Sequence, residues 1–153
     1  MAENSDRDLE AILARKRAKD EKVAVETQQR LEQEAAALQK RHDARLRWKD
    51  VQRPAFAAVI HELNSKLDQA NLKLDLVEAT SDYRPAIDSF SIRLSDKGRD
   101  TGNSFAIHVS ALGVVQVAHV QLRDGGTLSA RTVDPVDAEN FKKLLLSFLD
   151  AAI

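Results

Sequence analysis

The chain has 153 residues, of which 31% are charged, and its formal net charge is −1 at pH 7. This is the length of one domain, and the near-neutral charge gives no overall attraction to nucleic acid or anionic membranes. With no cysteine, disulfides, thiol nucleophiles and cysteine-based zinc sites are excluded. There is no signal-peptide pattern at the N-terminus and no apolar run of ~18 residues, so we expect a cytoplasmic protein with no membrane span.

The first 53 residues contain neither proline nor glycine and are rich in strong helix formers. Opposite charges recur four residues apart, as at Lys16 and Asp20 or Arg30 and Glu34, and each such pair stabilises a solvated helix by about 0.2–0.5 kcal/mol. The pattern predicts a long charged helix over residues 6–50. We therefore divide the chain into a helical arm, residues 1–53, and a compact domain, residues 54–153.

The apolar seam of the predicted arm is thin. The best heptad register uses Ala24, Leu31, Ala35 and Leu38, but it also places Glu21, Gln28, His42 and Arg45 at core positions. Because a tight dimeric coiled coil needs Leu, Ile or Val there, a weak coiled coil, a solitary helix and a helix packed on its own domain all remain open. The candidate self-association residues are Leu9, Ile12, Leu13, Leu31 and Leu38.

A basic stripe ends the arm. It consists of Arg41, Arg45, Arg47, Trp48, Lys49 and Arg53. Like charges four residues apart repel each other on a helix, so the stripe requires counter-charges. These could be acidic side chains of the domain or of a second subunit, an acidic partner protein, or phosphates with Trp48 stacked on a base. The near-neutral net charge makes nucleic acid the less favoured partner.

A second helix follows the break or kink expected at Gln52-Arg53-Pro54, because apolar residues from Phe56 to Ala70 recur with helical spacing. From Leu72 the period changes to two, which predicts a strand over residues 72–78, with continuation of the helix as the competitor. Residues 80–85 are expected to form a loop. Alternating patterns and turn residues then predict strands at residues 90–94, 105–109, 114–122 and 127–133, with a two-residue hairpin turn at Asp124-Gly125-Gly126.

The last helix has a well-marked start, with Asp134 as the expected cap and Pro135 at the first helical position. A wide apolar stripe runs from Val136 to Ala152. The predicted class is therefore α+β. It combines a long N-terminal charged helix that forms a weak coiled coil, a second helix, a four- or five-stranded antiparallel meander and a C-terminal amphipathic helix.

One face of the predicted sheet is polar and carries Arg93, His108 and Ser110. This face is either ordinary solvated sheet or a binding surface for an anionic ligand or a protein. His108 and His119 would be cross-strand neighbours if they share a face, but the sequence has no metal-binding spacing. We expect no metal, no cofactor and no catalytic residue.

These observations favour a non-enzymatic interaction or scaffold module that self-associates through its N-terminal helix, most simply as a homodimer. An unidentified protein partner is compatible with the same surfaces. The alternatives are a nucleic-acid-binding protein that uses the stripe at residues 41–53, and a small-ligand binder that uses the polar sheet face.

Overall fold

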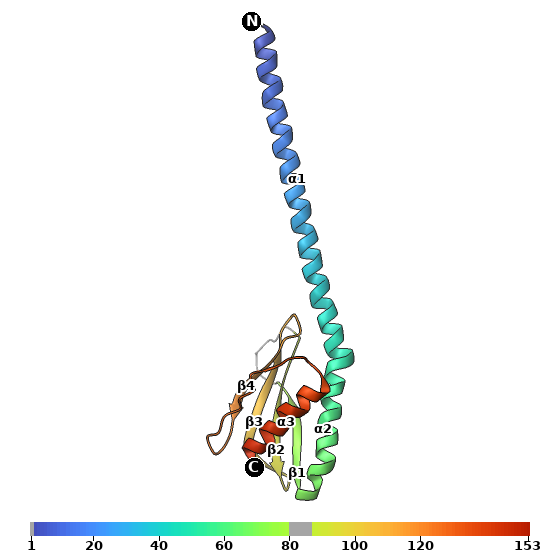
Figure 1. Ribbon diagram of the computed structural model, residues 1–153, viewed down its shortest axis with the longest axis vertical. Helices are drawn as coiled ribbons and strands as arrows, with labels where there is room; N and C mark the ends of the chain where they lie inside the picture. The colour runs from blue at the N-terminus through green and yellow to red at the C-terminus, as the bar shows by residue number, and fades with distance from the viewer. Residues whose placement is uncertain (1, 80–86) are drawn as a thin grey trace. The chain divides into compact units, whose positions relative to one another are not determined.

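The computed structural model describes residues 2–79 and 87–153, with side chains from Asn4 onward (Figure 1). The elements are helix α1 (Ala2–Arg47), the π-helical turn η1 (Trp48–Gln52), helix α2 (Arg53–Leu67), the 3-10 turn η2 (Asp68–Ala70), strands β1 (Leu72–Glu78), β2 (Asp88–Asp96), β3 (Arg99–Val109), β4 (Val115–Gln121) and β5 (Thr132–Val133), and helix α3 (Ala138–Ala152). The α+β class is confirmed. The loop expected at residues 80–85 lies outside the described residues.

The chain divides into two compact units, residues 1–40 and 41–153. In the first unit, every described side chain, from residue 4 to residue 40, is exposed. The second unit contains the whole hydrophobic core, which includes Ala44 from the last turns of α1 and Trp48 from η1. The folded unit therefore begins before the boundary at residue 54 that the sequence suggested.

Of the break or kink expected at residues 52–54, the structure shows no break: the backbone stays helical through Pro54, with a π-helical irregularity just before it. Gln52 and Arg53 both have right-handed helical φ and ψ, and the N–H of Arg53 bonds to the carbonyl of Trp48 five residues earlier. A π-helical turn of this kind is one of the known ways in which a helix accommodates an irregularity. Proline then occupies the first turn of α2, where a missing N–H costs little.

The five strands form one antiparallel sheet in the order β1-β2-β3-β4-β5, which confirms the predicted meander. Residues 72–78 are strand and not helix. Asn71 explains the switch: it has a left-handed backbone (φ 59°) that ends η2 and turns the chain into β1. Asparagine is one of the few residues that tolerates this conformation.

Asn64 on α2 fixes the edge strand β1 to the helix above it. Its amide group accepts a hydrogen bond from the backbone N–H of Leu74 (2.8 Å) and donates one to the carbonyl of Leu74 (2.9 Å). Leu74 is buried. The side chain thus satisfies two backbone groups on an edge strand that would otherwise be left without a partner.

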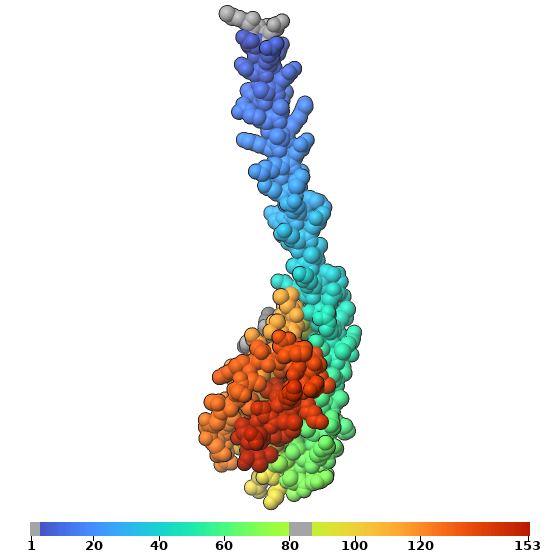
Figure 2. All heavy atoms as spheres, viewed as in Figure 1, coloured from blue at the N-terminus to red at the C-terminus, as the bar shows by residue number. Residues whose placement is uncertain are grey.

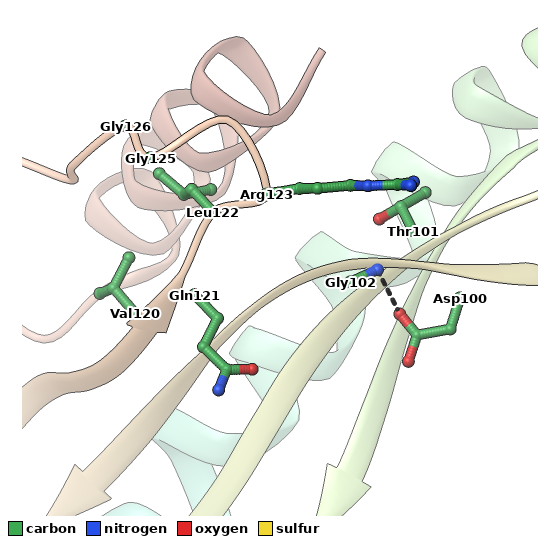
Figure 3. A pocket seen from close by; sticks show the side chains of 9 residues that line it. All are labelled: Asp100, Thr101, Gly102, Val120, Gln121, Leu122, Arg123, Gly125 and Gly126. Atoms are coloured by element: carbon green, nitrogen blue, oxygen red, sulfur yellow. Dashed lines mark hydrogen bonds between the residues drawn. The ribbon is translucent and has the colours of Figure 1, made fainter.

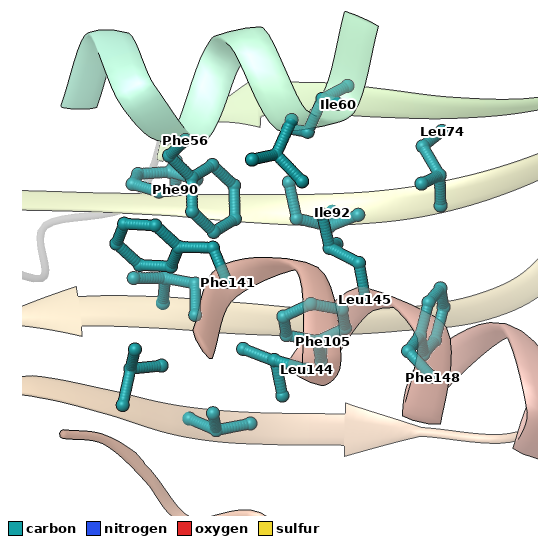
Figure 4. Close-up of a cluster of buried hydrophobic side chains, with 14 of the residues drawn as sticks. Phe56, Ile60, Leu74, Phe90, Ile92, Phe105, Phe141, Leu144, Leu145 and Phe148 are labelled. Carbon is teal, nitrogen blue, oxygen red and sulfur yellow. The ribbon is translucent and has the colours of Figure 1, made fainter. Parts of the chain in front are cut away.

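Helices α2 and α3 cover one face of the sheet, and the core lies between them and the strands (Figure 4). The rings of Phe56 and Phe141 meet edge to face with centroids 4.4 Å apart, and Phe56 meets Phe90 at 5.3 Å. Farther along, Phe105 of β3 packs on Phe148 of α3 at 4.8 Å. These aromatic contacts connect both helices to the central strands.

Two local predictions near the C-terminus differ from the structure. The strand expected over residues 127–133 is reduced to Thr132–Val133, and residues 122–131 form a turn and an irregular connection in place of a two-residue hairpin. Helix α3 begins at Ala138 instead of Pro135. Its cap is Asp137, whose carboxylate accepts the backbone N–H of Asn140 at 2.9 Å, the interaction that defines an N-cap.

Candidate functional site

The described side chains of α1 from residue 4 to residue 40 are all exposed, and several of them are apolar (Figure 2). The predicted self-association residues are all exposed: Leu9 by 54%, Ile12 by 51%, Leu13 by 45%, Leu31 by 51% and Leu38 by 65%. Charged pairs stabilise the same helix, since Lys16 and Asp20 lie 3.0 Å apart and Arg30 and Glu34 lie 3.9 Å apart. A solvated helix with several large apolar side chains is thus available for contact.

The two apolar patches of the arm, residues 9–13 and 31–38, lie on one face of α1. Leu9 and Leu31 are separated by two 11-residue repeats, and so are Leu13 and Ala35. Eleven residues make just over three turns of an α-helix, so side chains at this spacing point in nearly the same direction. We call this surface the apolar face of α1. Val25, 55% exposed, points away from it.

The predicted basic stripe is divided by the structure. Trp48 is only 2% exposed, and its ring packs against Phe90 and Phe141 with centroids 6.2 and 6.4 Å away. The indole N–H donates a hydrogen bond of 2.9 Å to the carboxylate of Asp88 on β2. The indole is therefore part of the core and is not available to stack on a base.

Arg53, the last residue of the stripe, has the acidic counter-charges that the sequence required. Its guanidinium forms ion pairs with Glu78 on β1 and Asp88 on β2, and it lies over the ring of Phe90 at 5.2 Å. Burial by itself would lower the pKa of Arg53, but the hydrogen bonds and charges of these two carboxylates raise it overall. The charge is therefore fixed, and this end of the stripe has a structural role.

The remaining basic residues of the stripe, Arg41, Arg45, Arg47 and Lys49, are exposed. Of these, Arg41, Arg45 and Lys49 recur every four residues and so lie along one side of the helix. Together with Arg47 they are the part of the predicted stripe whose side chains face solvent. We call Arg41, Arg45 and Lys49 the cationic row.

The structure brings together only some of the residues predicted for the polar sheet face. Arg93 is exposed and lines a surface hollow of about 430 Å³ with neighbours that include Lys73, Asp75, Ser95 and Asp100. Ser110 follows β3, where its hydroxyl accepts the N–H of Val114 at 3.0 Å. Ser110 therefore holds the turn between β3 and β4.

His108 and His119 are neighbours, with ring centroids 5.4 Å apart. A bulge in β4 produces this contact, because His119 lies where the β3–β4 register shifts and has a positive φ of 49°. The hydroxyl of Ser89 lies 3.3 Å from Nδ1 of His108. Burial, together with the charge of His119, lowers the pKa of His108, so the ring is neutral at pH 7.

A second hollow, of about 670 Å³, lies between the start of β3 and the segment after β4 (Figure 3). Asp100 accepts the N–H of Gly102 at 2.8 Å, and Arg123 extends beside Thr101. The sequence around residues 95–102 has residue types found in phosphate loops, but the structure places it in the β2–β3 hairpin. No helix of the described chain begins at residues 95–102 to direct its dipole at an anion.

The comparisons with known proteins add no relative. Neither the protein-family models, nor the curated proteins, nor the solved structures include a match to this chain. Within residues 2–79 and 87–153, no helix is both long enough and apolar enough to span a membrane. In the same ranges, no three acidic or histidine side chains gather as a metal site would need.

The sequence did not reveal the partners of Arg53. Glu78 and Asp88 are 25 and 35 residues away from it along the chain. Only the pairing of β1 with β2 brings both carboxylates to the start of α2. Sequence spacing alone could identify an unsatisfied charge here, but not the residues that satisfy it.

Proposed function

We propose that this protein is a non-enzymatic interaction or scaffold module that self-associates, as a homodimer, through the apolar face of α1. The observation that carries the proposal is the exposure of Leu9, Leu13, Leu31 and Leu38 on one face of a long helix. A cytoplasmic location agrees with the composition and belongs to the same proposal.

The physical argument is the burial of this face. Moving a leucine side chain fully out of water is worth about 1.5–3 kcal/mol, and each of these side chains is about half exposed. Association also costs about 4–15 kcal/mol in lost translational and rotational freedom. Since the face is narrow and its centre is polar, we expect a weak, concentration-dependent dimer with a Kd in the micromolar range or above.

The test is the solution mass of a charged variant of the apolar face. In the double variant Leu31→Glu with Leu38→Glu, two chains would bring four carboxylates into the interface, and the mass should fall to that of a monomer. The matched control is Val25→Glu, because Val25 is similarly exposed but lies off the face. If the double variant and the control associate equally, the apolar face is not the contact surface.

The cationic row supports a second candidate function, the binding of nucleic acid. Its three side chains are exposed and could each neutralise one phosphate. Binding should then fall steeply with salt and be lost when Arg41, Arg45 and Lys49 are all replaced by alanine. Absence of any salt-dependent binding of DNA or RNA by the intact chain would remove this candidate.

The hollow beside Arg93 supports a weaker third candidate, the binding of a small anion on the polar sheet face. Carboxylates of Asp75 and Asp100 line the same hollow and oppose an anion there. For this reason we rank it below the other two.

A further inference from the structure

We propose that two copies of α1 pair in antiparallel orientation about residue 22, so that residues 6–13 of one chain lie opposite residues 31–38 of the other. This inference rests on the self-association proposed above and adds its direction and register. It follows from how the apolar and charged residues are distributed along the exposed helix.

The positions that line the apolar face are symmetric about residue 22. In order, they are residues 6, 9, 13, 17, 20, 24, 27, 31, 35 and 38, and reversal of the chain gives the same set. In an antiparallel pair centred on residue 22, each position of the apolar face therefore lies opposite another position of the apolar face of the partner. The resulting five pairs are Asp6 with Leu38, Leu9 with Ala35, Leu13 with Leu31, Arg17 with Thr27, and Asp20 with Ala24, each occurring twice.

The sizes of the facing side chains are compatible in this register. Leu9 meets the small Ala35, and the two leucines at positions 13 and 31 meet each other near both ends of the contact. In the middle of the contact the small residues Ala24 and Thr27 face Asp20 and Arg17. Alternation of large and small side chains across facing positions is how helices interdigitate.

Charge argues against the parallel alternative. The segment 15–19 contains four basic residues, Arg15, Lys16, Arg17 and Lys19, with no acidic residue among them. In a parallel, in-register pair this segment would face its own copy, and so would Asp20 on the apolar face. Facing like charges are destabilising in helix pairs and set partner orientation.

In the antiparallel pair the same basic segment faces residues 25–29, where the only charged residue is Glu26. Repulsion between two clusters of four positive charges is thereby replaced by attraction to a carboxylate. The cost is the like-charge pair Glu10 opposite Glu34, which occurs twice at the border of the face; Lys22 also lies level with its own copy, on the side of the helix away from the face. The balance of charge therefore favours the antiparallel orientation.

The direction can be measured by pulsed electron paramagnetic resonance on the full chain. The protein has no cysteine, so single replacements at Glu10 and Glu34 introduce the only thiols for spin labelling. Both residues are exposed. At about 1.5 Å per residue, equivalent labels in the antiparallel dimer lie about 36 Å apart along the axis.

Three samples decide the question at a concentration where the solution mass is that of a dimer. The proposal expects long distances in Glu10→Cys and in Glu34→Cys, and a short distance, below about 20 Å, in the dimer that mixes the two variants. A short distance in either single variant, or the lack of any short distance in the mixture of the two, overturns the antiparallel register. A monomeric mass for the unlabelled chain at every concentration would instead refute the self-association itself.

Discussion

Replacement of Trp48 tests whether the end of the arm belongs to the folded core. The indole is 2% exposed and contacts Phe90 and Phe141, and its N–H bonds to Asp88. Removing a buried tryptophan side chain to alanine costs about 3–5 kcal/mol, because the transfer free energy is lost and a cavity is left. We expect this loss of stability in Trp48→Ala.

The Trp48→Phe variant separates packing from hydrogen bonding. Phenylalanine keeps most of the ring contacts but cannot donate to Asp88. Because Asp88 keeps its ion pair with Arg53, its carboxylate is not left without a partner. We therefore expect a smaller loss of about 1–2 kcal/mol.

Urea unfolding followed by circular dichroism measures both variants. Leu46→Ala is the control, since Leu46 is 43% exposed and lies two residues before Trp48 in the last turn of α1, and it should stay within about 0.5 kcal/mol of the parent. A loss below about 1 kcal/mol in Trp48→Ala would refute the placement of the indole in the core. So would quenching of the parent's tryptophan fluorescence by iodide as efficiently as that of free tryptophan.

Three further outcomes follow from local contacts. Asn64→Leu should cost about 2–4 kcal/mol in urea unfolding, because it leaves the buried N–H and carbonyl of Leu74 without partners. Asp137→Ala should cost about 1 kcal/mol through loss of the cap on Asn140. Burial and a neighbouring charge lower the pKa of His108 in the folded protein. As the pH falls below 6.5, the unfolded chain therefore binds a proton at His108 more readily than the folded chain does, and the free energy of unfolding falls. His108→Gln should lessen this fall between pH 7 and pH 5, and an unchanged pH profile would contradict the assignment.

The fold could be predicted from sequence where one pattern dominates. Alternation of apolar and polar residues identified β2, β3 and β4, and the short connections made an antiparallel meander the natural arrangement. The apolar stripe of α3 was equally clear in the sequence. These features depend on local periodicity, which the final packing preserves.

The start of α3 and the length of β5 were less predictable because local signals compete there. Asp134 and Asp137 can both cap a helix, and Pro135 supports the earlier start. In the structure Asp137 is the cap and accepts the backbone N–H of Asn140. The side-chain amide of Asn140 also donates a hydrogen bond of 2.8 Å to the carbonyl of Pro135. That contact depends on the three-dimensional path of the chain, and no periodic pattern in the sequence indicates it.

The residues of the candidate site could be predicted from the sequence. Which of them join the core and which face solvent could not. The basic stripe has one regular spacing, yet Arg53 and Trp48 serve the core while the cationic row faces solvent. What separates them is the packing of η1 and α2 on β1 and β2. Conversely, the apolar face of α1 was present in the sequence, and the continuous helix shows that its two patches share a direction.

The solution mass of the full chain beside that of residues 41–153 tests the central claim most directly. The fragment begins at residue 41 because Ala44 and Trp48 belong to the core, which a cut at residue 50 would remove. Sedimentation equilibrium should show a full chain whose mass rises toward a dimer with concentration, and a folded fragment that stays monomeric. Equal association of the two, or a full chain that is monomeric at every concentration, would contradict assembly through the apolar face of α1.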